Sequence, residues 1–129
     1  MDYAISLRLH RPFGETVQQV RAVLDDQGFG VLTEIDVRAT LREKLGEAME
    51  AYLILGACNP GLAHQALGVD RQIGLLLPCN VVIRTDGDET VVEALDPQVM
   101  VSVSDRADLG PVADEAKERL ATALRRLDS

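Results

Sequence analysis

The sequence predicts an α+β domain in which helices pack over one face of a curved antiparallel sheet. Three observations favour this class. Short segments that alternate between apolar and polar residues are typical of half-buried strands, and segments with apolar residues at helical spacing lie between them. The tight turn Asp86-Gly87-Asp88 joins two strand-like segments and predicts a hairpin. Because the other connections are short, antiparallel pairing is favoured, in the order β-α-β-(α)-β-α-β-β-α.

The first half of the chain is expected to form two strands, each followed by a helix. Residues 3–9 and 30–37 alternate between apolar and polar side chains, as half-buried strands do. Residues 13–28 carry apolar side chains at helical spacing and finish on a glycine, the residue that commonly follows a helix. Residues 39–46 show the same features over a shorter length, so a short helix is expected there.

The second half begins with the segment around which the rest of the domain is organised. Residues 51–57 are apolar on both faces and predict an interior strand. Residues 59–68 begin with Asn-Pro, which suits the N-cap and first position of a helix, and end with Gly. Residues 70–77 are mixed and are expected to add a further helical turn. Residues 80–85 and 89–95 form the predicted hairpin.

The C-terminal segment is expected to be partly irregular before a final helix. Residues 98–103 predict either a short further strand or an irregular segment. The last helix is expected to begin at Asp108 or Leu109 and to bury an apolar stripe. At 129 residues, the chain is expected to be a single domain, residues 1–129, that needs neither a disulfide nor a metal ion to fold.

The composition excludes several classes of function. With 13 basic and 21 acidic residues, the chain has a net charge of −8, which argues against nonspecific nucleic-acid binding and against binding to an anionic membrane. No apolar segment is long enough to cross a bilayer, and the first residues do not resemble a signal peptide. A cytoplasmic location is therefore expected, where two cysteines are more commonly thiols than a structural disulfide.

The two cysteines are the residues best suited to chemistry. Cys58 ends an expected strand directly before a helix N-terminus, where free N–H groups and the helix dipole favour a thiolate. Cys79 has a similar setting between Pro78 and an expected strand. If these strands are neighbours, the thiols lie at one end of the sheet and could form a redox pair or half of a metal site. The alternative is that each cysteine is a small buried hydrophobic residue in a tight turn.

Other known sites are not indicated. The cysteine spacing is not CxxC, so the zinc signal is weak, and His64 would supply a third ligand at best. The sequence contains no GxSxG, Walker A, GxGxxG or HExxH motif. The sequence therefore identifies no cofactor, and whether the protein is an enzyme stays open.

Three segments together resemble the DUF302 family, a set of small proteins of unknown function. They are EIDVRATLREKLG, YLILGACNPGLAHQAL and IGLLLPCNVVI, and the likeness runs from the first strand to about Met100. The resemblance implies an antiparallel α+β domain of the TBP-like type and makes a homodimer the expected partner arrangement. It also implies one shared site. The candidate residues of that site are Asp36, Lys44, Cys58, Asn59, Cys79 and Asn80.

Three hypotheses about function follow from these residues. The first is a binding or sensing module that holds a small ligand or a metal ion at Cys58 and Cys79. The second is a structural homodimer whose Asn and Pro residues keep turns in shape. The third is a thiol-dependent redox enzyme, in which Lys44 favours a thiolate and Asp36 holds the lysine in place.

Overall fold

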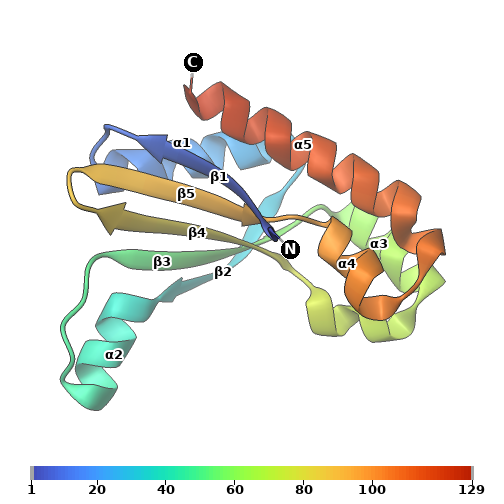
Figure 1. Ribbon diagram of the computed structural model, residues 1–129, viewed down its shortest axis with the longest axis horizontal. Helices are drawn as coiled ribbons and strands as arrows, with labels where there is room; N and C mark the ends of the chain where they lie inside the picture. The colour runs from blue at the N-terminus through green and yellow to red at the C-terminus, as the bar shows by residue number, and fades with distance from the viewer. Residues whose placement is uncertain (1, 129) are drawn as a thin grey trace.

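The structure is a computed structural model, and it describes residues 2–128. Figure 1 shows the arrangement of its helices and strands. In chain order these are β1 (Ala4–Leu9), α1 (Phe13–Asp26), β2 (Gly30–Asp36), α2 (Val37–Leu45), β3 (Tyr52–Cys58), α3 (Pro60–Val69), the 3-10 helix η1 (Arg71–Leu76), β4 (Cys79–Asp86), β5 (Glu89–Leu95), α4 (Gln98–Ser104), the 3-10 helix η2 (Ala107–Leu109) and α5 (Gly110–Asp128).

The strands form one five-stranded sheet in the order β1-β5-β4-β3-β2. Every neighbouring pair is antiparallel, and β4 and β5 form the hairpin around Gly87. The two long helices α1 and α5 lie side by side over one face of the sheet (Figure 1). The predicted α+β class, with an open antiparallel sheet and helices on one side, is confirmed. No helix among residues 2–128 combines the length and the apolar run that crossing a bilayer requires.

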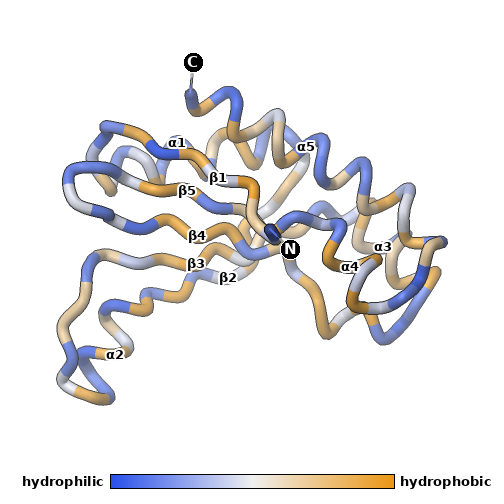
Figure 2. The backbone as a smooth tube through the Cα atoms, in the orientation of Figure 1, coloured by the Kyte–Doolittle hydropathy of each residue, from blue (hydrophilic) through white to orange (hydrophobic). Residues whose placement is uncertain are grey.

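The main core lies between the sheet and these two helices. Strand residues of one parity point into it, such as Leu55, Val81 and Ile83, each with no exposed surface. The helices contribute residues at helical spacing, among them Val20 of α1 and Leu120 of α5. In Figure 2 the hydrophobic and hydrophilic residues of α5 alternate along the helix, as an amphipathic helix requires.

A second core cluster fills a lobe at one end of the sheet. It is formed by α3, η1, α4, η2 and the first turns of α5. Because α5 spans both clusters, it joins the lobe to the sheet. The cluster consists of Leu62, Ala66, Ile73, Met100, Leu109, Val112, Ala113 and Ala116.

The expectation of a strand or an irregular segment at residues 98–103 is wrong, because this segment is helix α4. The side chain of Asp96 accepts a hydrogen bond from the backbone N–H of Gln98 at 2.9 Å and so supports the first turn. Met100 is 4% exposed and packs into the lobe. The valines of this segment favour a strand, but strand preference depends mainly on the surroundings of a side chain and only weakly on its backbone. Here the burial of Met100 outweighs that preference.

Candidate functional site

Both cysteines lie at the end of the sheet that faces the lobe. Cys58 is the last residue of β3 and Cys79 is the first residue of β4. The two strands are neighbours, and Cys79 is paired with Ala57 in the antiparallel register. Both cysteines are free thiols, with Cys58 half-buried and Cys79 buried. The structure therefore brings together the two residues that the sequence predicted would meet if their strands paired.

The two cysteines line one small cavity of about 30 Å³. The cavity lies where the two core clusters meet, because Phe29 and Ala57 of the main core and Leu62 and Val112 of the lobe all border it. Its surface is almost entirely apolar. The full lining is Phe29, Ala57, Cys58, Asn59, Leu62, Ala63, Ala66, Leu77, Pro78, Cys79, Met100, Val112 and Ala116. Three of these side chains contain sulfur.

Burial determines the protonation of one thiol. Burial, and to a smaller extent the nearby Cys58, together raise the pKa of Cys79 from 9.0 to about 11. At neutral pH, the Cys79 thiol is therefore protonated. This differs from the expectation that its setting would favour a thiolate, because the desolvation of a buried thiolate outweighs any effect of the chain turn.

Asn59 fixes the chain beside the cavity. Its side-chain Oδ1 accepts a hydrogen bond from the backbone N–H of Leu62 at 3.2 Å, so it caps α3 as the sequence predicted. Its side-chain N–H donates to the carbonyl oxygen of Gln27 at 3.5 Å. Arg119 of α5 donates to the same oxygen at 3.3 Å. Asn59 thus ties the start of α3 to the turn between α1 and β2, where Gly28 has a positive φ of 83°.

Gly56, which precedes the cavity residue Ala57, is a packing position that the sequence reasoning missed. A Cβ atom at this position would lie 2.2 Å from Oγ1 of Thr33 and 2.9 Å from Cγ of Pro78. Both distances are shorter than real Cβ contacts allow, so only glycine lets β2 and the Pro78 segment approach β3 here. A glycine inside an otherwise apolar strand is a sequence signal for such a close approach.

The comparisons with known proteins identify the family. The family model described as "Domain of unknown function DUF302" matches residues 5–127. The chain belongs to the DUF302 family. It is also similar to the crystal structure of an uncharacterized conserved DUF302 protein from Bacillus stearothermophilus, with a TM-score of 0.91 and 27% sequence identity over 98% of each chain. No curated protein matches this chain. The family description assigns no function.

Two residues of the DUF302-like motifs lie away from the cysteines. Asp36 pairs with Leu53, five residues before Cys58 on β3, which places it roughly 16 Å along the strand from the cavity end. Its side-chain Oδ1 accepts a hydrogen bond from the N–H of Ala39 at 2.9 Å and caps α2. Lys44 is exposed in the last turn of α2. The implied cluster of Asp36, Lys44 and the two cysteines is not formed within one DUF302 chain.

The remaining candidates do not line the cavity. Asn80 is exposed on the face of the sheet opposite α1 and α5, where Gly56 is its partner in the register. His64 is exposed on α3. Among residues 2–128, no three His, Cys, Asp or Glu side chains come together as ligands for a metal ion. A site built on the cysteines must therefore use two thiols and a ligand of another type.

Proposed function

We propose that this DUF302 protein binds a single soft metal ion, Cu(I), through Cys58 and Cys79, with the thioether of Met100 as a third ligand. One observation carries the proposal: the only two cysteines of the chain, far apart in sequence, line the same small cavity. Thiolates and thioethers are the ligands that select soft ions. Met100 is buried in the lobe and borders the cavity, which supports its place as the third sulfur.

The chemistry of the lining favours Cu(I) over other ions. Zn²⁺ sites in proteins almost always have four ligands drawn from Cys, His, Asp and Glu, and Ca²⁺ and Mg²⁺ require oxygen ligands. The cavity lining contains no His, Asp or Glu. Cu(I) accepts a low number of sulfur ligands in an apolar pocket, so two thiolates and one thioether suffice.

The size of the cavity favours a metal ion over an organic ligand, and the protonation of Cys79 favours a metal ion over use of this thiol as a nucleophile. Organic ligands generally occupy pockets of about 300–1,000 Å³, whereas this cavity measures about 30 Å³. A nucleophilic thiol needs a lowered pKa, whereas burial raises the pKa of Cys79. A metal ion displaces the proton from a thiol when it binds and needs no preformed thiolate.

The proposal is tested by anaerobic competition. The reduced protein is titrated into a solution of the Cu(I)–bicinchoninate complex, whose colour is lost as the protein removes the metal. We expect one equivalent of Cu(I) to be removed per chain, with a new thiolate-to-copper charge-transfer band in the ultraviolet. Cys58→Ser and Cys79→Ser should each abolish this binding, because each leaves a single thiol.

The methionines provide the matched control. Met100→Leu should weaken Cu(I) binding by about tenfold, a typical effect of losing one contributing ligand contact worth about 1.4 kcal/mol. Met49→Leu removes a methionine that lies outside the cavity lining and should leave the affinity unchanged. If the wild-type protein does not remove Cu(I) from the chelator, or if Cys58→Ser/Cys79→Ser binds it equally well, the proposal is wrong.

A further inference from the structure

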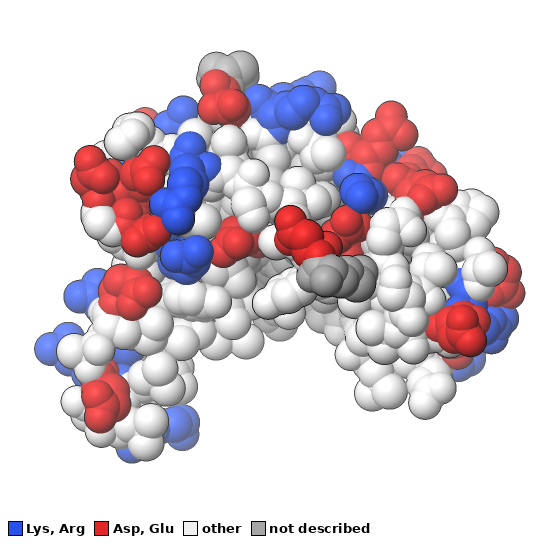
Figure 3. Space-filling view, in the orientation of Figure 1, with Lys and Arg blue, Asp and Glu red and all other residues white. Residues whose placement is uncertain are grey.

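The face of the sheet that points away from α1 and α5 is open. Figure 1 shows α2 at one end of this face and the lobe of α3, η1 and α4 at the other, with no helix of residues 2–128 across the middle. The surface between these two ends is concave in the space-filling view (Figure 3). We call this surface the open face. It consists of the outward residues of the five strands.

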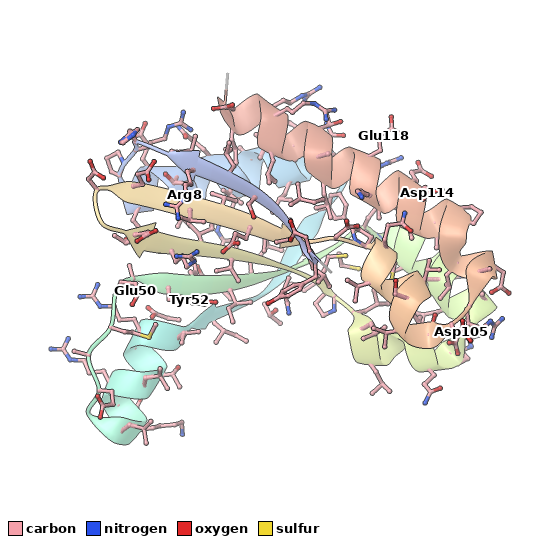
Figure 4. All side chains as sticks on the ribbon, viewed as in Figure 1. Arg8, Glu50, Tyr52, Asp105, Asp114 and Glu118 are labelled. Atoms are coloured by element: carbon pink, nitrogen blue, oxygen red, sulfur yellow. The ribbon has the colours of Figure 1, made fainter. Side chains whose placement is uncertain are left out.

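Apolar side chains form the centre of the open face. Ile35, Ile54 and Val82 lie in one row, because the register pairs Ile35 with Ile54 and Ile54 with Val82. Ile35 is 49% exposed, and the other two are half-buried. Tyr52, labelled in Figure 4 at the start of β3, borders a groove of about 240 Å³ together with Val82 and Leu95. An uncovered apolar surface of this kind on a sheet marks an interaction site.

In a protein whose overall charge is −8, the charged side chains of the open face are paired with one another, and at its edge Arg8 pairs with Asp86 and Glu89. Its central charged residues are Arg84 and Glu93, which pair with each other at 3.2 Å. Figure 3 shows the concave surface as almost entirely free of acidic and basic side chains, whereas both colours are frequent above it. Two copies of the chain can therefore meet here without bringing unpaired charges together or removing them from water.

Helix α2 offers a second apolar surface that is only partly covered. Val37, Leu41 and Leu45 follow one another at intervals of four residues and form a stripe along one side of the helix. Nevertheless, α2 contains no buried residue, and Leu45 is 68% exposed. A helix of nine residues is marginal in water by itself and depends on packing of its apolar side. Within one chain, Val37 and Leu41 are half-buried against the sheet side of the helix, whereas Leu45 remains uncovered.

We infer that a second copy of this chain covers the open face, with the α2 stripe of each copy packed against the other copy. In a two-fold symmetric dimer, each surface patch is used twice. A chain that has both the apolar open face and the α2 stripe therefore supplies both halves of the contact. The inference does not depend on copper binding, since it rests on different residues and on a different face of the sheet.

The available area is sufficient for a dimer. The open face, with five strands of about six residues each, covers roughly 400 Å² in projection. The side of a nine-residue helix adds roughly 140 Å². The two projections sum to roughly 540 Å², and because the accessible surface of side chains exceeds their projection, this area is comparable to the ~800 Å² that each partner contributes to a standard stable interface.

The experiment measures mass in solution by sedimentation equilibrium over a range of protein concentrations. We expect the wild-type chain to have twice its chain mass of 14.0 kDa. Ile35→Glu on the open face and Leu45→Glu on α2 should each raise the dissociation constant of the dimer at least tenfold, because each buries a charge in the contact. Both side chains are exposed in the single chain, so neither substitution should unfold it. Circular dichroism checks this point.

Ala22→Glu is the matched control. It adds the same charge at an exposed position of α1, on the opposite side of the sheet, and should change the dissociation constant by less than threefold. Hydrogen exchange gives an independent readout: the amides of residues 37–45 should be protected in the wild-type dimer and exchange rapidly in Ile35→Glu. A monomeric wild-type chain would overturn the inference, and so would a dimer that persists in both Ile35→Glu and Leu45→Glu.

Discussion

Replacement of Gly56 by alanine tests how tightly the chain is packed between the cavity and the open face. The added Cβ would lie 2.2 Å from Oγ1 of Thr33 and 2.9 Å from Cγ of Pro78. Thr33 can turn its hydroxyl away at a cost of about 1 kcal/mol, which is typical of an unfavourable rotamer. The ring of Pro78 cannot rotate, so its backbone segment must shift by several tenths of an ångström.

The two contacts together set the size of the effect. Adding a methyl group to a well-packed interior usually costs about 1–3 kcal/mol. Alanine also restricts the unfolded chain and so returns about 0.5 kcal/mol. We therefore expect the free energy of unfolding of Gly56→Ala to be lower by about 2 kcal/mol. For a chain of this length, such a loss lowers the midpoint of thermal unfolding by about 7 °C.

The assay is urea unfolding followed by far-ultraviolet circular dichroism, at one fixed protein concentration, because the chain has no tryptophan for fluorescence. Gly68→Ala is the control with the opposite sign: no atom lies within 4 Å of a Cβ at this helical position, so alanine should stabilise the protein by about 0.5–1 kcal/mol. Thr33→Ala should restore about half of the stability lost in Gly56→Ala. A loss below 0.5 kcal/mol, or no recovery with Thr33→Ala, would refute the reasoning.

Three further predictions concern single groups. Asn59→Ala removes the cap of α3 and its bond to Leu62 and should cost about 1–2 kcal/mol by urea unfolding. The pKa of Cys79 is raised in the folded chain, so the unfolded chain loses this proton first as the pH rises. The free energy of unfolding should therefore be constant below pH 9 and fall by about 2–3 kcal/mol as the pH rises to about 11. Cys79→Ala should lack this decrease when both proteins are unfolded by urea at pH 8 and at pH 11. Asp36→Ala removes the cap of α2 and should speed hydrogen exchange at Ala39 by about fivefold, while global stability changes by less than 1 kcal/mol.

The fold could be predicted from the sequence because its local signals agree with its tertiary structure. The Asp-Gly turn at Gly87 joins the two strands that it was expected to join, and Gly46 ends α2 in the left-handed conformation with φ of 68°. Asn59 caps the helix that it was expected to cap. Residues 98–103 were the exception, because their local preference for a strand competes with burial of Met100, which only the assembled lobe makes favourable.

The site was less predictable than the fold because its residues meet through strand pairing. The sequence could identify Cys58 and Cys79 as candidates, but only the antiparallel pairing of β3 and β4 brings them to one cavity. The pairing of β2 with β3 separates Asp36 from them, since Asp36 lies opposite the other end of β3. No local pattern could reveal Met100 as a third sulfur, because it comes from a helix that the sequence did not predict.

Pro78 connects the two proposed sites. Its side chain borders the cysteine cavity, and its Cγ also lies close to the space above Gly56, whose register partner Asn80 is on the open face. The cavity and the open face are therefore separated by little more than one residue of β3 and one proline ring. A ligand that displaced Cys79 and its neighbour Pro78 would therefore act on a residue that also packs next to Gly56, beneath the open face. If copper binding and dimerisation are coupled, thermodynamic reciprocity requires each to change the affinity of the other by the same factor, and Gly56 is the position at which that coupling would be lost.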